Sequence, residues 1–312
     1  MNSTYEQISM FSSADPLLEE AELAMQAMKF EEAEGLYQKA RSLNPWISNI
    51  DSMLMIVHSF KNHFDRTSDI PSFLGSVWTD LPKAVERGEI KTQEIGIVEG
   101  YLAHFADAYL PKTNTYLDTA ERIHQGNLFM KTRKWHEAHK VILSSLCDGY
   151  QNRADLWGYY GDVCYCLNRM REASAAYAKA MLTDPHRVDY FRMVHPEIKR
   201  QLSSLCEEME RRQAQAILLF KCWSAGCITI QRRHLEDTGN GDSEKIHILL
   251  SKEPVDESER LHLFSSCLYY DQSQPKDRIH IGLREKMKAL DRERFELYLK
   301  ILQGRENQTV LF

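Results

Sequence analysis

The sequence has few of the features that mark secreted, membrane or nucleic-acid-binding proteins. Its 312 residues carry a net charge of −6 and a pI near 6.1, so a basic surface suited to nucleic acid is not expected. The most apolar stretch, residues 216–230, is interrupted by Lys221, Ser224 and Gly226 and is too short to span a bilayer. The opening residues lack the positive charge and apolar core of a secretory signal. Seven cysteines form an odd set without regular spacing, which is typical of small buried side chains in a reducing compartment. We therefore expect a cytoplasmic protein that binds neither membrane nor nucleic acid.

Motifs of catalysis and of cofactor binding are also lacking. His136 and His139 stand at i and i+3, whereas a zinc-protease helix needs histidines at i and i+4. Gly239 and Gly241 are not followed by the lysine of a phosphate-binding loop, and no nucleophile elbow occurs. The sequence thus predicts no catalytic residue, no metal site and no cofactor, and we expect a protein that is not an enzyme.

What the sequence does contain is a repeat. The chain is 43% hydrophobic and 27% charged, as folded soluble proteins are. Residues 154–187 form a window of 34 residues in which small side chains stand where two helices would cross and large ones fill the flanking space. A proline near the end of the window stops the second helix. The signature residues of this window are Trp157, Tyr160, Gly161, Ala173, Tyr177, Ala180 and Pro185.

Two further windows follow the same template. Residues 14–47 place Ala21, Phe30, Ala33, Tyr37, Ala40 and Pro45 at the matching positions. Residues 119–153, which start at Thr119, match with Gly126, Phe129, Trp135 and Ala138 but end poorly, with Tyr150 where proline is expected. This pattern resembles the tetratricopeptide repeat (TPR), a pair of antiparallel helices. The resemblance implies an all-α fold, an α-solenoid of helical hairpins that stack side by side.

The rest of the chain is expected to be helical as well. Residues 48–118 carry apolar stripes at helical spacing and are either degenerate repeats or inserted helices. Gly96 and Gly100, one turn apart in this segment, predict a close helix crossing. We therefore expect a repeat domain over 1–187 and a helical capping region over 188–312. In that region we expect helices from Pro196, over 257–270 and over 277–302, with a flexible loop near 236–244.

The TPR resemblance also points to a binding groove. In that family the first helix of each pair lines the concave side, and the matching positions of the last two windows predict a partner-binding surface. Polar and aromatic side chains there suit peptide backbone, carboxylates and binding hot spots, although Met130 and Tyr159 are equally suited to packing between repeats. The clamp with which some family members hold a chaperone tail is not present, because its basic positions carry Ala120, Ile123, Asp155 and Gly158. The predicted groove residues are His124, Asn127, Met130, Lys131, Asp155, Tyr159, Asp162 and Tyr165.

Three functions are compatible with these features. The first is a non-enzymatic scaffold or adaptor that binds a peptide or helix of a partner protein in the groove. The second is an assembly or secretion chaperone that shields one client. The third is an enzyme or ligand sensor with a site in the C-terminal region, near Trp223, His234, Tyr269 and Tyr270. Stacked repeats with an exposed end also allow the chain to form homo-oligomers.

Overall fold

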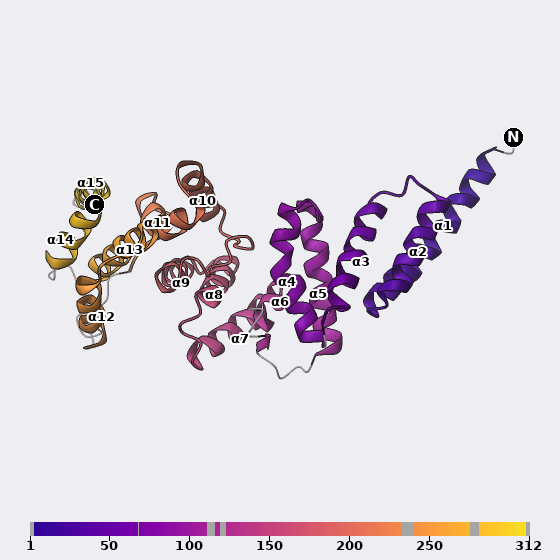
Figure 1. The fold of residues 1–312 in the computed structure, drawn as a ribbon, viewed down its shortest axis with the longest axis horizontal. Helices are drawn as coiled ribbons and strands as arrows, with labels where there is room; N and C mark the ends of the chain where they lie inside the picture. Colours follow the sequence, from indigo (N-terminus) through magenta and orange to yellow (C-terminus); the bar gives the residue numbers. More distant parts are fainter. Residues whose placement is uncertain are drawn as a thin grey trace. The chain divides into compact units, whose positions relative to one another are not determined.

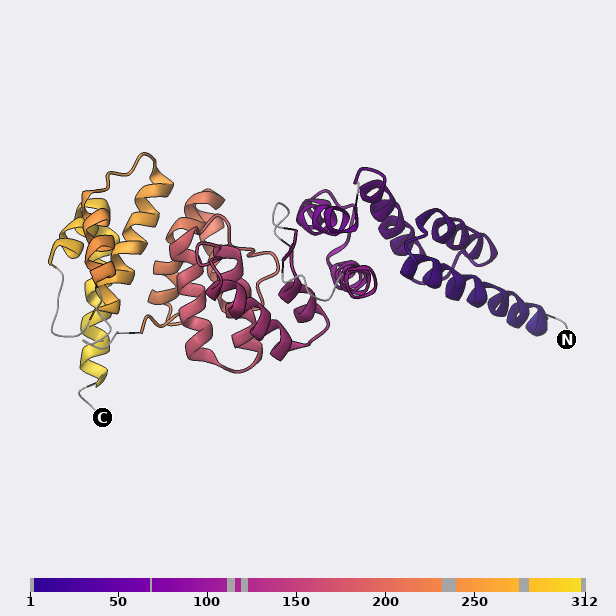
Figure 2. The ribbon, with the colours of Figure 1, turned by 90° about the horizontal axis from the view of Figure 1, so that it is seen from below.

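The computed structural model of this protein describes residues 3–67, 69–110, 116–118, 123–231, 240–274 and 281–309 (Figures 1 and 2). Within these ranges the chain is helical apart from one short pair of strands, which confirms the predicted all-α class. Contacts between Cα atoms divide the chain into two compact units, Met1–Val141 and Ile142–Phe312. The predicted domain boundary after residue 187 lies inside the second unit.

The first unit consists of successive helices, joined in most places by short connections, and one pair of short strands. Between the N-terminal pair and the middle window lie α3, α4 and α5, in the segment for which degenerate repeats or inserted helices were expected. Helix α7 begins in this unit and continues past its end. The elements are α1 (Ser3–Gln26), α2 (Phe30–Leu43), α3 (Ile50–Phe64), α4 (Ile70–Glu86), the 3₁₀ turn η1 (Thr92–Glu94), α5 (Ile95–Tyr109), β1 (Tyr116–Asp118), β2 (Ile123–His124), α6 (Gln125–Lys131) and α7 (Trp135–Cys147).

Helices α1 and α2 occupy the N-terminal repeat window and lie side by side in both views (Figures 1 and 2). The small side chains Ala21 and Ala33 are fully buried, as expected where the two helices meet. Helix α2 ends at Leu43, before the Asn44–Pro45 step, because proline cannot continue a helix and the residue before it favours extended backbone. Local sequence therefore sets both the packing face and the end of this pair.

An aromatic core holds α2, α3, α4 and α5 together. The ring of Phe30 lies 5.8 Å from those of Phe60 and Phe73 and 6.1 Å from that of Phe105, measured between ring centroids. These separations fall in the range in which tilted aromatic pairs attract one another. One face of α5 is thereby fixed against the core, which leaves its other face to form a surface.

The middle window is only partly helical. Its first helix, α6, begins at Gln125 and has 7 residues, so the template start at Thr119 is wrong for a helix. Ile123 and His124 instead form an extended strand that pairs with β1, and the His124 side chain then caps α6 by accepting a hydrogen bond from the Gly126 N–H at 3.0 Å. Thr119 and Ala120 lie outside the described residues.

The second unit contains the third repeat window and the C-terminal helices. Helices α10 and α13 begin where the sequence predicted. The loop expected near 236–244 falls in part outside the described residues, and α12 begins at Asn240 within it. The elements are α8 (Ala154–Cys166), α9 (Met170–Thr183), α10 (Pro196–Glu208), α11 (Arg211–Ser224), α12 (Asn240–Ser251), α13 (Glu257–Ser273), α14 (Ile281–Leu290) and α15 (Arg292–Thr309).

Helices α8 and α9 pack closely at Gly161, and both views show them side by side (Figures 1 and 2). A Cβ atom on Gly161 would lie 2.7 Å from Cδ1 and Cε1 of Tyr177, so only glycine fits against this ring. Ala173, at the corresponding position of the second helix, is buried. The close approach predicted for this window is therefore present.

The helix predicted over 277–302 is broken in two. Asp291 ends α14 and starts α15, because its Oδ1 accepts a hydrogen bond from the Arg294 N–H at 3.0 Å, as an N-cap side chain does. A buried network then fastens α15 to the unit. The Tyr298 hydroxyl donates to Asp271, which also pairs with Arg284 at 3.1 Å.

Candidate partner-binding surfaces

The predicted groove residues of α8 share one face of that helix. Asp155, Tyr159, Asp162 and Tyr165 are spaced three or four residues apart, which aligns their side chains along the helix. Asp155, Tyr159 and Asp162 are buried, and Tyr165 is half-buried. The structure therefore brings the four together, on a face that is largely closed to solvent.

The segment 184–195, which follows α9, closes this face. The Tyr159 hydroxyl donates a hydrogen bond to Oδ2 of Asp189 at 2.6 Å, and the same oxygen pairs with Nη1 of Arg192 at 3.0 Å. Burial opposes ionisation of Asp189, but Arg192 and the tyrosine hydroxyl outweigh it, so that the pKa of Asp189 lies below its ordinary value. Burial raises the pKa of Tyr159, and the charge of Asp189 adds to this. The ionised carboxylate and the neutral phenol thus fix segment 184–195 on α8.

Asp162 provides the second anchor. Its Oδ1 accepts hydrogen bonds from the Tyr177 hydroxyl at 2.6 Å and from the Val194 N–H at 2.8 Å. The Tyr165 ring packs against the ring of His195, with centroids 4.7 Å apart. One carboxylate therefore joins α8, α9 and the covering segment.

Asp155 is paired within its own turn. Both of its carboxylate oxygens accept hydrogen bonds from the Arg153 guanidinium, at 2.8 and 2.6 Å, in a bidentate arrangement. Tyr159, Asp162 and Tyr165 thus contact the chain's own covering segment or helices, and Asp155 contacts the residue just before α8. A role of the α8 residues in partner binding stays a prediction.

The predicted residues of α6 are mostly buried as well. His124 caps the helix, and Met130 packs in the interior. Lys131 forms an ion pair with Glu99, with Nζ and Oε2 2.7 Å apart, and its ammonium lies 5.9 Å from the centre of the Trp78 ring. Asn127 is 1% exposed, and within the described part of the chain neither polar atom of its side chain has a hydrogen-bond partner.

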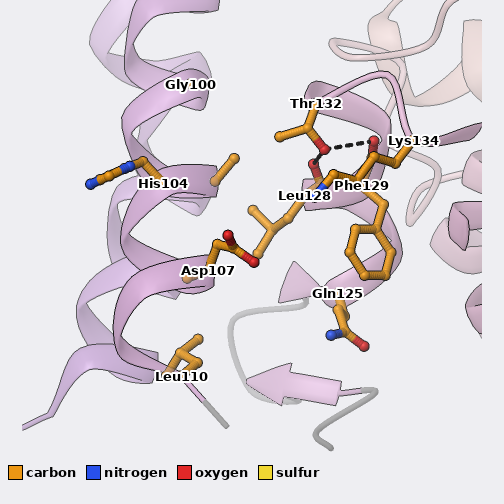
Figure 3. Close-up of a pocket in the computed structure, with 11 residues that line it drawn as sticks. Gly100, His104, Asp107, Leu110, Gln125, Leu128, Phe129, Thr132 and Lys134 are labelled. Carbon is orange, nitrogen blue, oxygen red and sulfur yellow. Dashed lines mark hydrogen bonds between the residues drawn. The ribbon is translucent and has the colours of Figure 1, made fainter. Parts of the chain in front are cut away.

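An open groove lies between α5 and α6 and is lined by other residues than those predicted for partner binding (Figure 3). Its volume is about 250 Å³. In Figure 3, α5 forms one side, where Asp107 is directed toward Leu128 on α6, whereas the His104 ring is directed away from α6. The complete lining is Gly100, Ala103, His104, Ala106, Asp107, Leu110, Gln125, Leu128, Phe129, Thr132 and Lys134.

Small side chains on α5 create this groove. A Cβ atom on Gly96 or Gly100 would meet no atom of another described helix within 4 Å, so the predicted close helix crossing at these glycines is wrong. The opposite face of α5 is fixed by Phe105 in the aromatic core and by Tyr101, whose hydroxyl donates to Glu22. The open face is therefore part of a rigid helix.

The groove combines an apolar floor with a polar rim. Leu110, Leu128 and the alanines of α5 provide the floor, and Asp107, Gln125 and Lys134 provide the rim. Asp107 is exposed and, among the described residues, has no ion-pair or hydrogen-bond partner. A concave apolar site with a few polar groups at its edge is suited to one large apolar side chain of a partner that carries a cation nearby.

Two further hollows lie in the second unit. One, of about 740 Å³, is lined by α10, α11 and α15, and another, of about 220 Å³, lies between α12 and α13. Of the C-terminal residues considered for a ligand site, Trp223 is 1% exposed in the core, Tyr270 lines the smaller hollow, and His234 lies outside the described residues.

Comparisons with protein-family models, with curated proteins and with solved structures gave no match for this chain. None of the described helices combines the length and the apolar character needed to cross a membrane.

Sequence reasoning missed both the cover on α8 and the groove beside α5. The cover had a weak signal, because Pro185 and Pro196 bracket a short segment that contains Asp189 and Arg192 at capping distance. The groove had a clearer one, since the small residues of α5 were visible. From the sequence alone, however, Gly96 and Gly100 predict a close helix crossing and not an open groove.

Proposed function

We propose that this chain is a non-enzymatic, protein-binding scaffold of the TPR type, and that it holds a segment of a partner protein in the groove between α5 and α6. The observation that carries the proposal is the groove itself: an apolar floor on a helix packed against the aromatic core, open to solvent, with at its rim the Asp107 carboxylate, which has no partner among the described residues. Such sites bind an amphipathic helix or an extended peptide through one or two apolar anchors.

The helix pairs support the solenoid part of the proposal. Windows 14–47 and 154–187 each coincide with two helices joined by a 3-residue connection, 27–29 and 167–169. In both pairs the small residues at the template positions are buried, and in the second a ring packs directly on Gly161. These are the contacts that stacked helical hairpins need. The free thiols of the seven cysteines are compatible with a cytoplasmic location.

The α8 face is not part of the proposed site. A partner there would have to displace segment 184–195 and break the bonds of Asp162 and Asp189. The α5–α6 groove requires no such displacement.

The test fills the groove without disturbing the fold. Gly100→Leu introduces a side chain into open space in the groove, and Gly96→Leu introduces the same side chain one turn earlier on the same helix, outside the lining. Leucine has a higher helix propensity than glycine by about 0.8–1 kcal/mol, so neither variant should lose stability. Tagged full-length chain in both forms, beside the unmodified chain, is used to capture partners from cell extract, and recovered proteins are quantified by mass spectrometry.

We expect at least one protein to be recovered in near-stoichiometric amount with the unmodified chain and with Gly96→Leu, and to be lost with Gly100→Leu. Asp107→Asn should weaken binding of the same partner, once purified, by about 2–5-fold, because a rim ion pair contributes about 0.5–1 kcal/mol. Equal recovery of every protein by all three chains would remove the groove as the binding site.

A further inference from the structure

The end of α11 brings two cysteines together. Gly226, with φ +77°, terminates the helix in the left-handed conformation that favours glycine. The Cys227 N–H donates to the Cys222 carbonyl at 3.0 Å, and the Gly226 N–H donates to the Trp223 carbonyl at 3.1 Å. This pair of hydrogen bonds defines a Schellman motif, in which a contact between the side chains of the first and last residues is frequent.

This contact commonly joins two apolar side chains. Here both positions, Cys222 and Cys227, carry cysteine. The backbone hydrogen bond holds the two Cα atoms no more than about 7 Å apart, given standard bond lengths, and disulfides form over about 4.4–6.8 Å. Sγ of Cys227 also lies 3.3 Å from the Cys222 carbonyl oxygen, so it points back over the helix end. The motif thus keeps the two Cα atoms close to the range that a disulfide needs and directs the Cys227 sulfur back toward Cys222.

The two thiols differ in exposure and in acidity. Cys222 is fully buried, whereas Cys227 is half-buried and reachable by a small molecule. A hydrogen bond from the Cys222 thiol is the main cause that lowers the pKa of Cys227, and Arg200 adds to it, against burial and the charge of Glu197. Burial raises the pKa of Cys222. Cys227 is therefore the better nucleophile of the pair.

The chain beyond the pair is anchored, which keeps the sulfur atoms in place. The Thr229 N–H donates to Oγ of Ser174 at 2.7 Å, and the Ser174 hydroxyl donates to the Thr229 carbonyl at 3.1 Å. These bonds fasten the residues after Cys227 to α9. The two cysteines are thus held beside each other by hydrogen bonds on both sides of the pair.

We propose that Cys222 and Cys227 form a peroxide-reactive dithiol site, in which Cys227 is oxidised first and Cys222 then closes a disulfide. The Cys227 thiolate attacks one oxygen of hydrogen peroxide, the O–O bond breaks, and the products are a sulfenic acid on Cys227 and hydroxide. The Cys222 sulfur then attacks the sulfenic sulfur, and its proton and the departing hydroxide form water. Two thiols are oxidised to one disulfide while one peroxide is reduced to two waters. A dithiol reductant reverses the modification.

The sequence offers a direct readout. Trypsin cleaves after Lys221 and after Arg232, so both cysteines lie in one peptide, Cys222–Arg232. The folded full-length chain is treated with hydrogen peroxide, its remaining thiols are alkylated after unfolding, and this peptide is weighed. We expect its mass to fall by about 2 Da, the two thiol hydrogens, with no alkylation at either cysteine. Cys206, which is exposed and lies outside the pair, serves as the internal control and should stay alkylatable at the same dose.

Two variants assign the order of events. In Cys222→Ser, Cys227 should accumulate sulfenic acid that dimedone traps, and in Cys227→Ser, the buried Cys222 should stay reduced. If Cys222–Arg232 retains both thiols at doses that oxidise Cys206, or if Cys227 reacts no faster than Cys206, the proposal is wrong. Partner capture through the α5–α6 groove is measured independently, so failure of either proposal leaves the other standing.

Discussion

Replacing Gly161 with alanine should destabilise the second unit, even though alanine is the better helix former. The added Cβ would lie 2.7 Å from two ring carbons of Tyr177, about 1 Å closer than carbon atoms normally approach. The ring cannot turn away cheaply, because it is fully buried and its hydroxyl donates to Asp162 at 2.6 Å. Overpacking of this kind costs about 1–3 kcal/mol, against a helix-propensity gain of about 1 kcal/mol or less.

We therefore expect Gly161→Ala to lower the free energy of unfolding by about 1–2 kcal/mol and the melting temperature by about 2–8 °C. The matched control is Gly158→Ala, on the same helix, where the new Cβ would meet only Cγ1 of Val188 at 3.4 Å, an ordinary contact. That variant should be neutral or up to about 1 kcal/mol more stable. Thermal unfolding gives the sign, and hydrogen exchange of peptides from α8 and α9 shows that the change is local.

A double-mutant cycle isolates the contact. In a Tyr177→Leu background the ring is gone, so adding Gly161→Ala should cost nothing further, and the interaction energy of the pair should be about 1–3 kcal/mol. If Gly161→Ala proves as stable as Gly158→Ala, or if its cost persists without the ring, the close packing of α8 on α9 is refuted.

Three further outcomes are expected from thermal unfolding. Tyr298→Phe should cost about 1–3 kcal/mol, because the hydroxyl that it removes donates to the buried carboxylate of Asp271; an unchanged melting temperature would show that this bond contributes nothing. Asp69→Ala should cost about 1 kcal/mol, since it removes the side-chain cap of α4, and Asp69→Asn, which keeps a capping oxygen, should restore most of the loss. Burial lowers the pKa of His262 below 6.5, so the unfolded chain takes up a proton more readily and stability should fall as the pH drops below about 6.5. His262→Gln should flatten this fall between pH 7.5 and 5.5, and an equal slope in both proteins would contradict the assignment.

The two outer repeat windows were predictable because their signals are local. In α1 and α2, alanines and aromatics at fixed spacing determine which face is buried, and the Asn44–Pro45 step determines where α2 ends. The same holds for α8 and α9, of which α9 ends at Thr183, directly before Asp184–Pro185. The buried faces and the helix ends depend on steric fit within about 34 residues. The spacing of small, large and proline residues in the sequence is enough to predict them.

In the middle window, a strand stands at Ile123 and His124, where the repeat template predicts a helix. The spacing of apolar residues does not predict this difference. Ile123 and His124 pair with β1 across an intervening stretch, and the His124 ring then begins α6 at Gln125. Capping also divided the predicted C-terminal helix, since Asp291 can start a helix wherever its neighbours allow the turn. In each case one polar side chain, His124 or Asp291, accepts a hydrogen bond from a backbone N–H and so fixes where a helix begins.

The covered α8 face shows why a family position does not by itself identify a binding site. Asp155, Tyr159 and Asp162 have the side chains expected of a polar groove, but a buried polar group is stable only when it is hydrogen-bonded, and the chain's own segment 184–195 bonds two of the three.

A partner at that face would first have to break the bond from Tyr159 to the charged Asp189, which contributes about 1.5–3 kcal/mol. Since each 1.4 kcal/mol is about tenfold in affinity, the displacement alone would weaken binding by about 10–100-fold. The Lys131–Glu99 ion pair joins α6 to α5 outside the groove lining, and the Thr132 hydroxyl bonds only to the Leu128 and Phe129 carbonyls at its own end of α6. A partner in the groove would have to break neither, so a partner of equal contact quality should bind there first. A surface that a partner can reach without breaking bonds to a covering segment is therefore the first place to test for binding, and the predicted α8 residues are the second.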